Sequence, residues 1–128
     1  MSIPFNSQQG LVIFPVDIYG PNAAGVARLA LDTGATETTV SRRALRAVGI
    51  DPAQASLGSV PVITGSGRVS VPRVRLLRLD ALGQQRIDFI VQAHTLPPGL
   101  PIDGVLGLDF IRLYRLVVDL KTGYLVLE

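Results

Sequence analysis

An aspartate that directly follows an apolar run is the residue of this sequence with the most evident chemical potential. The apolar segment ending at Leu31 is followed by Asp32, Thr33 and Gly34. A carboxylate at the end of a buried strand is costly unless it is hydrogen-bonded or paired with another group. Gly34 frees the backbone to turn sharply, so that N–H groups of the loop can point at the carboxylate. We interpret these three residues as catalytic candidates.

The composition excludes several other kinds of active site. The 128 residues include no cysteine, so thiol nucleophiles, disulfides and zinc–thiolate sites are ruled out. His94 is the only histidine, which leaves little basis for a histidine metal cluster or a Ser-His-Asp triad. We therefore expect a site that uses no metal and no cofactor.

Charge and hydropathy narrow the range of partners. The net charge is only +2 and aromatic residues make up 5% of the chain, so nucleic acid is not an expected partner. Arg73 and Arg75 are expected on one solvated face of a strand. No apolar run approaches the length of a membrane span and the N-terminus lacks a signal-peptide pattern, so we expect no membrane association and, by default, a cytoplasmic location.

The length predicts one domain over residues 1–128, in which residues 1–9 form an extended N-terminal arm. Hydrophobic residues make up 48% of the chain, which is high for a small monomer and indicates a buried subunit interface.

The elements that must position Asp32 are mostly strands. Residues 11–31 are predicted to form a hairpin, and Pro15 within it indicates an edge or a bulge. A second hairpin is predicted around the glycines at 65 and 67. Further strands are predicted over 36–40, 85–93 and 102–107, and a closing hairpin over 115–128.

Two short helices complete the prediction. One spans 41–49, with Ser41 as its N-cap and Gly49 as its C-cap, and the other spans 108–114. A proline-rich loop over 95–101 cannot join a central strand ladder. The expected fold is therefore an all-β, small, closed barrel-like domain with one or two short helices.

Three segments together resemble the retropepsins, the retroviral-type aspartic proteases, and specifically their bacterial single-domain type. The segment ALDTGAT at 30–36 matches the apolar-apolar-Asp-Thr-Gly signature, and GVLGLDFI at 104–111 matches the second apolar-apolar-Gly motif. Between them, VITGSGRVSV at 62–71 falls where these proteins carry a glycine-tipped flap. The resemblance covers roughly residues 10–128 and implies an acid-protease fold and peptide-bond hydrolysis.

The resemblance implies a dyad of two aspartates, for which the aspartic proteases are themselves the standard example. Two acids held close together cannot both ionise, so they share a proton. The ionised acid activates a water as general base, and the protonated acid donates to the scissile carbonyl. In this family, the threonines that correspond to Thr33 bond across the axis between two copies.

The chain holds only one such motif, whereas pepsin-type chains carry two. The other acids lie in different contexts: Asp17 within a predicted strand, Asp109 at the start of a predicted helix and Asp119 before a turn. The second carboxylate is therefore expected to be Asp32 of another copy, in a homodimer with its active site on a two-fold axis.

The resemblance also marks residues that would bind a peptide or protein substrate. They lie beside the aspartate, on the flap and on the opposite wall: Ala30, Ala35, Thr36, Ile63, Thr64, Gly65, Ser66, Gly67 and Val105. One departure concerns Leu108, which stands where viral enzymes usually carry arginine, so a salt bridge of the family is not expected there.

Three alternative readings of the aspartate motif remain. Asp32 to Thr36 also fits the Asp-x-Gly-x-Thr phosphate loop of sugar kinases, although that fold needs two large domains. Asp32 could instead cap a tight turn in an inert β domain. The third alternative keeps the retropepsin-like barrel as a catalytically inert dimerisation or peptide-binding module.

Overall fold

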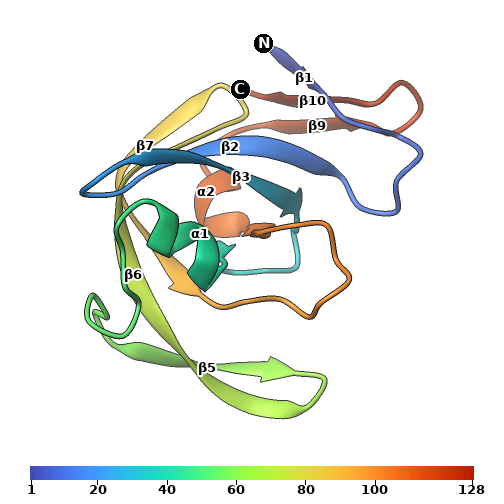
Figure 1. Ribbon diagram of the computed structural model, residues 1–128. Coiled ribbons are helices and arrows are strands. Elements are labelled where there is room, and N and C mark those ends of the chain that lie inside the picture. Colours follow the sequence, from blue (N-terminus) through green and yellow to red (C-terminus); the bar gives the residue numbers. More distant parts are fainter.

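A closed six-stranded barrel forms the body of the molecule, which a computed structural model describes over residues 1–128 (Figure 1). The strands follow one another around the barrel in the order β2, β3, β8, β4, β7 and β6, and β6 closes it by pairing with β2 as well as β7. Closure removes the exposed strand edges that an open sheet would leave. The bounds are β2 Ile13–Tyr19, β3 Ala24–Leu31, β4 Thr39–Val40, β6 Gly67–Ala81, β7 Gln84–Ala93 and β8 Gly104–Leu106. The predicted all-β barrel is confirmed.

Pro15 marks a place where the barrel wall is open on one side. It lies opposite Arg28 of β3, but the pairing of β2 with β6 covers only Asp17 to Tyr19. A proline has no backbone N–H to donate, so it suits a position without a second neighbouring strand. The sequence prediction of an edge at Pro15 is therefore confirmed.

The second predicted hairpin projects from the barrel. β5 (Ser59–Thr64) pairs only with the first half of β6, from Ser59 opposite Pro72 to Thr64 opposite Gly67. From Arg73 onward, β6 pairs with β7 instead. The 15-residue strand β6 thus serves both the hairpin and the barrel, and Figure 1 shows the hairpin extending below the barrel.

A separate three-stranded sheet brings the two chain ends together. β1 (Ser2–Pro4) pairs with β10 (Tyr124–Leu127), which pairs with β9 (Leu116–Asp119). Figure 1 shows the N- and C-termini close to each other on this sheet. Hydrogen bonds from Thr122, and to a smaller extent from Lys121, hold the pKa of Asp119 below its ordinary value at the turn between β9 and β10.

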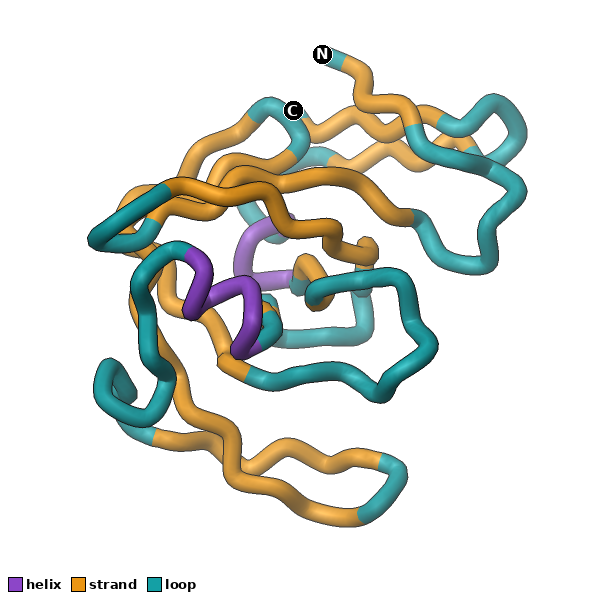
Figure 2. Tube along the Cα trace, viewed as in Figure 1, coloured by secondary structure: helices purple, strands orange, loops and turns teal.

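Two short helices lie against the barrel (Figure 2). In α1 (Arg42–Ala47) the Ser41 Oγ accepts a hydrogen bond from the Ala44 N–H at 3.1 Å, which confirms the predicted N-cap. α2 (Leu108–Ile111) is shorter than the predicted 108–114, because a tight turn follows Ile111. Neither helix has the length and apolar character needed to cross a bilayer.

One continuous core of 22 buried apolar residues fills the barrel. It includes Phe14 and Leu29 from the first hairpin, Leu76 from β6 and Phe110 from α2, all fully buried. Because Leu125 of β10 joins the same cluster, the terminal sheet and the barrel share one core.

Candidate active site

Asp32 begins the loop that follows β3. Its backbone N–H donates to the Leu106 carbonyl of the neighbouring parallel strand β8 at 3.0 Å. The Gly34 N–H donates to the Asp32 Oδ1 at 3.0 Å, and the Ala35 N–H donates to the Asp32 carbonyl at 3.2 Å. The loop therefore turns back on its own carboxylate and aims a backbone N–H group at it.

A second loop, directly after β8, packs against the aspartate loop. The Leu108 N–H donates to the Ala35 carbonyl at 2.8 Å and the Asp109 N–H to the Thr36 carbonyl at 3.2 Å. A Cβ added at Gly107 would lie 2.9 Å from the Ala35 carbonyl oxygen, so only glycine allows the two backbones to approach this closely. The two motifs singled out in the sequence therefore meet in space.

Asp109 and Thr38 join the two loops from behind, a link that sequence analysis missed. The carboxylate of Asp109 accepts from the Thr38 N–H at 2.9 Å and from the Thr38 hydroxyl at 2.7 Å. The same hydroxyl accepts from the Gly107 N–H at 3.0 Å. Thr38 is completely buried. Thr38 and Asp109 are 71 residues apart in the sequence, so no local sequence pattern predicts that they pair.

A cleft of about 640 Å³ opens beside Asp32. Three of the predicted substrate-binding residues and one of the catalytic candidates line it with the carboxylate. They are Ala35, Thr36, Ile63 and, from the catalytic set, Gly34; the cleft also contains Glu37, Thr39, Pro61, Val62 and Gln92, which sequence analysis did not single out. The aspartate loop and the arm of the β5–β6 hairpin thus face one space.

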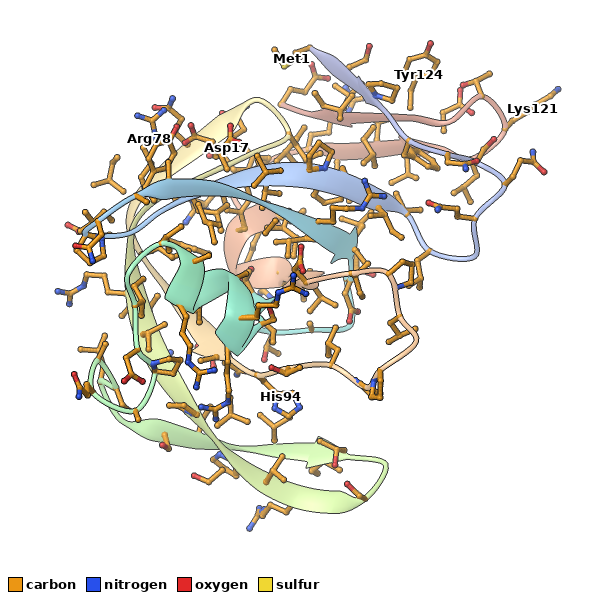
Figure 3. All side chains as sticks on the ribbon, in the orientation of Figure 1. Met1, Asp17, Arg78, His94, Lys121 and Tyr124 are labelled. Carbon is orange, nitrogen blue, oxygen red and sulfur yellow. The ribbon has the colours of Figure 1, made fainter.

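Two further hollows adjoin this cleft. Ala30, Val105 and Asp32 line a largely apolar hollow of about 370 Å³, completed by Leu11, Leu31, Leu96, Leu100 and Ile102. Thr64, Gly65 and Ser66 line another of about 680 Å³, on the other side of which lie His94 and the proline-rich loop. Figure 3 shows His94 on the side of the barrel that faces the hairpin.

Two predicted residues lie outside these hollows. Thr33 is exposed and makes no hydrogen bond within the chain. Gly67 ends the two-residue turn of the hairpin with a φ of +114°, so its role within one chain is to shape that turn.

An ion pair borders the cleft and corrects one expectation. Arg73 shares a face of β6 with the exposed Arg75 and its side chain is 40% exposed, but it is not simply solvated, because it donates to the Glu37 Oε1 at 2.5 Å. The Gln92 amide donates to the Glu37 Oε2 at 3.0 Å, so both carboxylate oxygens are occupied. Arg75 remains exposed as expected. Both oxygens of Glu37 therefore make structural hydrogen bonds. Asp32 is the other carboxylate of the cleft, and no other side chain makes a hydrogen bond or an ion pair with it.

No hydrogen bond joins Asp32 to a second acid of the chain, and Glu37, the other acid that lines the same cleft, is held by Arg73 and Gln92. Asp109 is held by Thr38, and neither an ion pair nor a hydrogen bond joins Asp32 to another side chain. The structure also brings no three histidine, aspartate or glutamate side chains together as metal ligands.

The fold is that of the retropepsins. The chain is similar to a retropepsin-like aspartic protease from Rickettsia conorii, with a TM-score of 0.73 and 16% identity over 99% of this chain and 88% of that one. The EIAV protease, solved with the inhibitor HBY-793, gives 0.64 and 14% identity over 86% and 92%. The retroviral protease-like domain of Ddi1 from Leishmania major gives 0.54 and 16% identity over 94% and 96%.

The sequence itself identifies the family. The model of the aspartyl protease family matches residues 14–110, which include both loops, the β5–β6 hairpin and the barrel. The chain therefore belongs to the aspartyl protease family. No curated protein sequence matches it significantly.

Proposed function

We propose that the protein is an aspartic endopeptidase that acts as a homodimer, with Asp32 of each copy forming one catalytic dyad. The observation that carries this proposal is the single unengaged carboxylate in the cleft, which has a backbone N–H at its Oδ1 and no acidic partner within the chain. One carboxylate cannot serve as general base and general acid in the same step, so a second copy has to supply the other.

In the proposed reaction, the ionised aspartate accepts a proton from a water molecule, whose oxygen attacks the carbonyl carbon of the scissile peptide bond. The protonated aspartate donates its proton to the carbonyl oxygen, giving a neutral tetrahedral intermediate. In the collapse, the aspartate that took the water proton donates it to the leaving nitrogen, the other aspartate accepts a hydroxyl proton from the intermediate, and the C–N bond breaks to give an acid and an amine. Two close carboxylates suit this exchange because mutual repulsion keeps one of them protonated.

The β5–β6 hairpin is proposed to act as the flap over the substrate. Ile63 on its arm is 84% exposed and borders the cleft, so within one chain little of this large apolar side chain is covered. An extended peptide lying between the hairpin and Asp32 would bury Ile63 and exclude water from the dyad. The adjoining apolar hollow favours substrates with apolar side chains next to the scissile bond.

Asp32→Asn tests the proposed function directly. Asparagine is nearly isosteric and keeps an oxygen for the Gly34 N–H, but it cannot act as the base. Cleavage of a peptide library should fall at least about a hundredfold, with the melting temperature unchanged. Asp17→Asn is the matched control, because Asp17 is exposed on β2 and makes no hydrogen bond through its side chain.

The outcomes separate an enzyme from the inert alternative. Retained turnover in purified Asp32→Asn would exclude the aspartate dyad. A wild-type protein that binds peptides, or only dimerises, without cleaving any of them would instead identify an inert module.

A further inference from the structure

Arg86 of β7 is a partly buried cation without an acidic partner. None of the three ion pairs in the structure includes it, and its Nε is buried without a hydrogen-bond partner. Burying a guanidinium is costly unless other groups replace the lost water. Its surroundings therefore have to stabilise the charge in another way.

Main-chain carbonyls and aromatic faces surround the Arg86 guanidinium. Its Nη2 donates to the carbonyl oxygens of Asp109 at 3.2 Å and Phe110 at 2.9 Å. Its central carbon lies over three rings, with centroid distances of 5.6 Å for Phe89, 5.2 Å for Phe110 and 5.9 Å for Tyr114. Aromatic faces attract cations electrostatically, and carbonyls at a helix end carry partial negative charge.

The two carbonyls depend on Arg86. In the turn after α2, the Arg112 N–H donates to the Leu108 carbonyl and the Tyr114 N–H to the Ile111 carbonyl. This arrangement leaves the carbonyls of Asp109 and Phe110 without a donor from the turn that follows. Arg86 therefore takes the place of the backbone donors that a longer helix would supply.

The segment that Arg86 holds is the one that supports the Asp32 loop. Asp109 itself accepts two hydrogen bonds from Thr38 through its carboxylate, and its N–H donates to the Thr36 carbonyl. The chain of contacts thus runs from β7 through α2 to the back of the aspartate loop. Phe89, which shares the Arg86 environment, meets Phe110 edge-on at 5.7 Å and fixes the same helix.

We propose that Arg86 is a positioning residue for catalysis: by clamping the carbonyl end of α2, it fixes Asp109 and, through Thr38, the placement of Asp32. The inference rests on the proposed function for its effect on rate. The structural part of the inference is that Arg86 stabilises the hydrogen bonds between Asp109 and Thr38, and this part does not depend on whether the protein is an enzyme. Because two Asp32 side chains must meet accurately to share a proton, a small displacement of the loop should lower turnover more than substrate binding.

The test compares Arg86→Met and Arg86→Lys with wild type. Methionine keeps an apolar stem against the aromatic rings and removes the charge and the donors, whereas lysine keeps a cation with one compact donor group. In Arg86→Met, amide hydrogen exchange at Thr38 and Gly107 should become about tenfold faster or more, while exchange at Val74 and Leu76 in the barrel stays unchanged. Its kcat should fall about tenfold or more, with a smaller change in KM. Arg86→Lys should lie between Arg86→Met and wild type.

Arg78→Met is the matched control. Arg78 also lies over an aromatic ring, at 4.6 Å from the Tyr19 centroid, and makes two contacts with Asp80, but it faces β2 and not α2. Figure 3 shows it near Asp17 on the barrel wall. Its replacement should leave exchange at Thr38 and Gly107 as well as kcat unchanged.

Each other outcome decides against the inference or against the proposed function. Wild-type exchange at Thr38 and Gly107 in Arg86→Met, or an equal rise at all barrel amides, overturns the positioning role. If Arg86→Met does not fold, wild-type exchange in Arg86→Lys overturns it in the same way. If wild type itself cleaves no peptide, the proposed function fails, and the exchange rates alone decide whether Arg86 holds the link.

Discussion

Gly34 and Gly107 each make room for a close contact at the site: Gly34 within the aspartate loop, and Gly107 between the two loops. A Cβ at Gly34 would lie 3.2 Å from the Asp32 Oδ1, where the Gly34 N–H now donates. At Gly107 the nearest atoms are backbone, which cannot move aside as a flexible side chain can. Glycine at these positions serves close approach, because neither has a positive φ.

The hairpin glycines differ in a way that only the backbone reveals. Gly65 and Gly67 both have open space around an added Cβ, but only Gly67 has a positive φ, at +114°. Gly67→Val should therefore strain the hairpin turn and lower kcat/KM for peptides several-fold or more, because β-branched residues resist this conformation. Gly65→Val is the matched substitution and should cost less. Peptide cleavage and thermal melting check both variants, and equal losses of kcat/KM would show that the turn conformation is not what matters.

At the scale of elements, β6 connects the β5–β6 hairpin, which is proposed to cover the substrate, to the barrel. Its outer half pairs only with β5, whereas its inner half pairs with β7 and contributes the buried Val74 and Leu76 to the core. Arg73 lies where the pairing changes and contacts Glu37 on the wall of the cleft. The base of the hairpin is thus fixed to the barrel. Its tip lies outside the core and pairs with no strand other than its own two.

The hairpin tip should therefore open and close readily in the free protein. Amide hydrogen exchange at residues 63–69 is expected to be fast without ligand and slow with a peptide inhibitor bound, because the peptide adds main-chain hydrogen bonds and buries Ile63. Exchange at Val74 and Leu76 serves as the internal control and should not change. Equal protection at 63–69 in both states would mean that the hairpin is a rigid element and that another segment covers the substrate.

At the scale of the whole molecule, one chain supplies all three strands of the terminal sheet. β1, β10 and β9 pair with one another, and Leu125 and Leu127 place the sheet on the common core. A single copy is therefore a folded unit with half of the proposed dyad. Dimerisation would supply the second aspartate of the proposed dyad, whereas the hydrophobic core is already formed within one chain.

Mixing subunits tests the shared site. When equal amounts of wild type and Asp32→Asn exchange freely, random pairing leaves about one quarter of the dimers with two aspartates, so specific activity per total protein should fall to about one quarter. Wild type mixed with the same amount of Asp17→Asn should keep its full activity. Specific activity of wild type should also fall on dilution, together with the dimer signal in sedimentation. Activity of one half in the first mixture, or a monomer that cleaves peptides, would contradict a site shared between copies.

Features that depend on neighbouring residues could be predicted from the sequence. β-rich runs on either side of glycine-containing turns predicted the hairpins, Ser41 predicted the start of α1, and Pro15 predicted an edge or a bulge, of which the structure shows the edge. Asp32 followed by glycine predicted a loop that turns N–H groups toward a carboxylate. In each case the physical cause acts over a few residues, so the local pattern contains it.

The tertiary structure decided how these features are held together. Asp109 and Thr38 are 71 residues apart, Arg73 and Glu37 are 36 apart, and Arg86 and Phe110 are 24 apart. Each of these polar side chains would suit a solvated surface in isolation. Only closure of the barrel brings them beside their partners, where burial makes an unsatisfied donor or carboxylate costly and so selects these contacts.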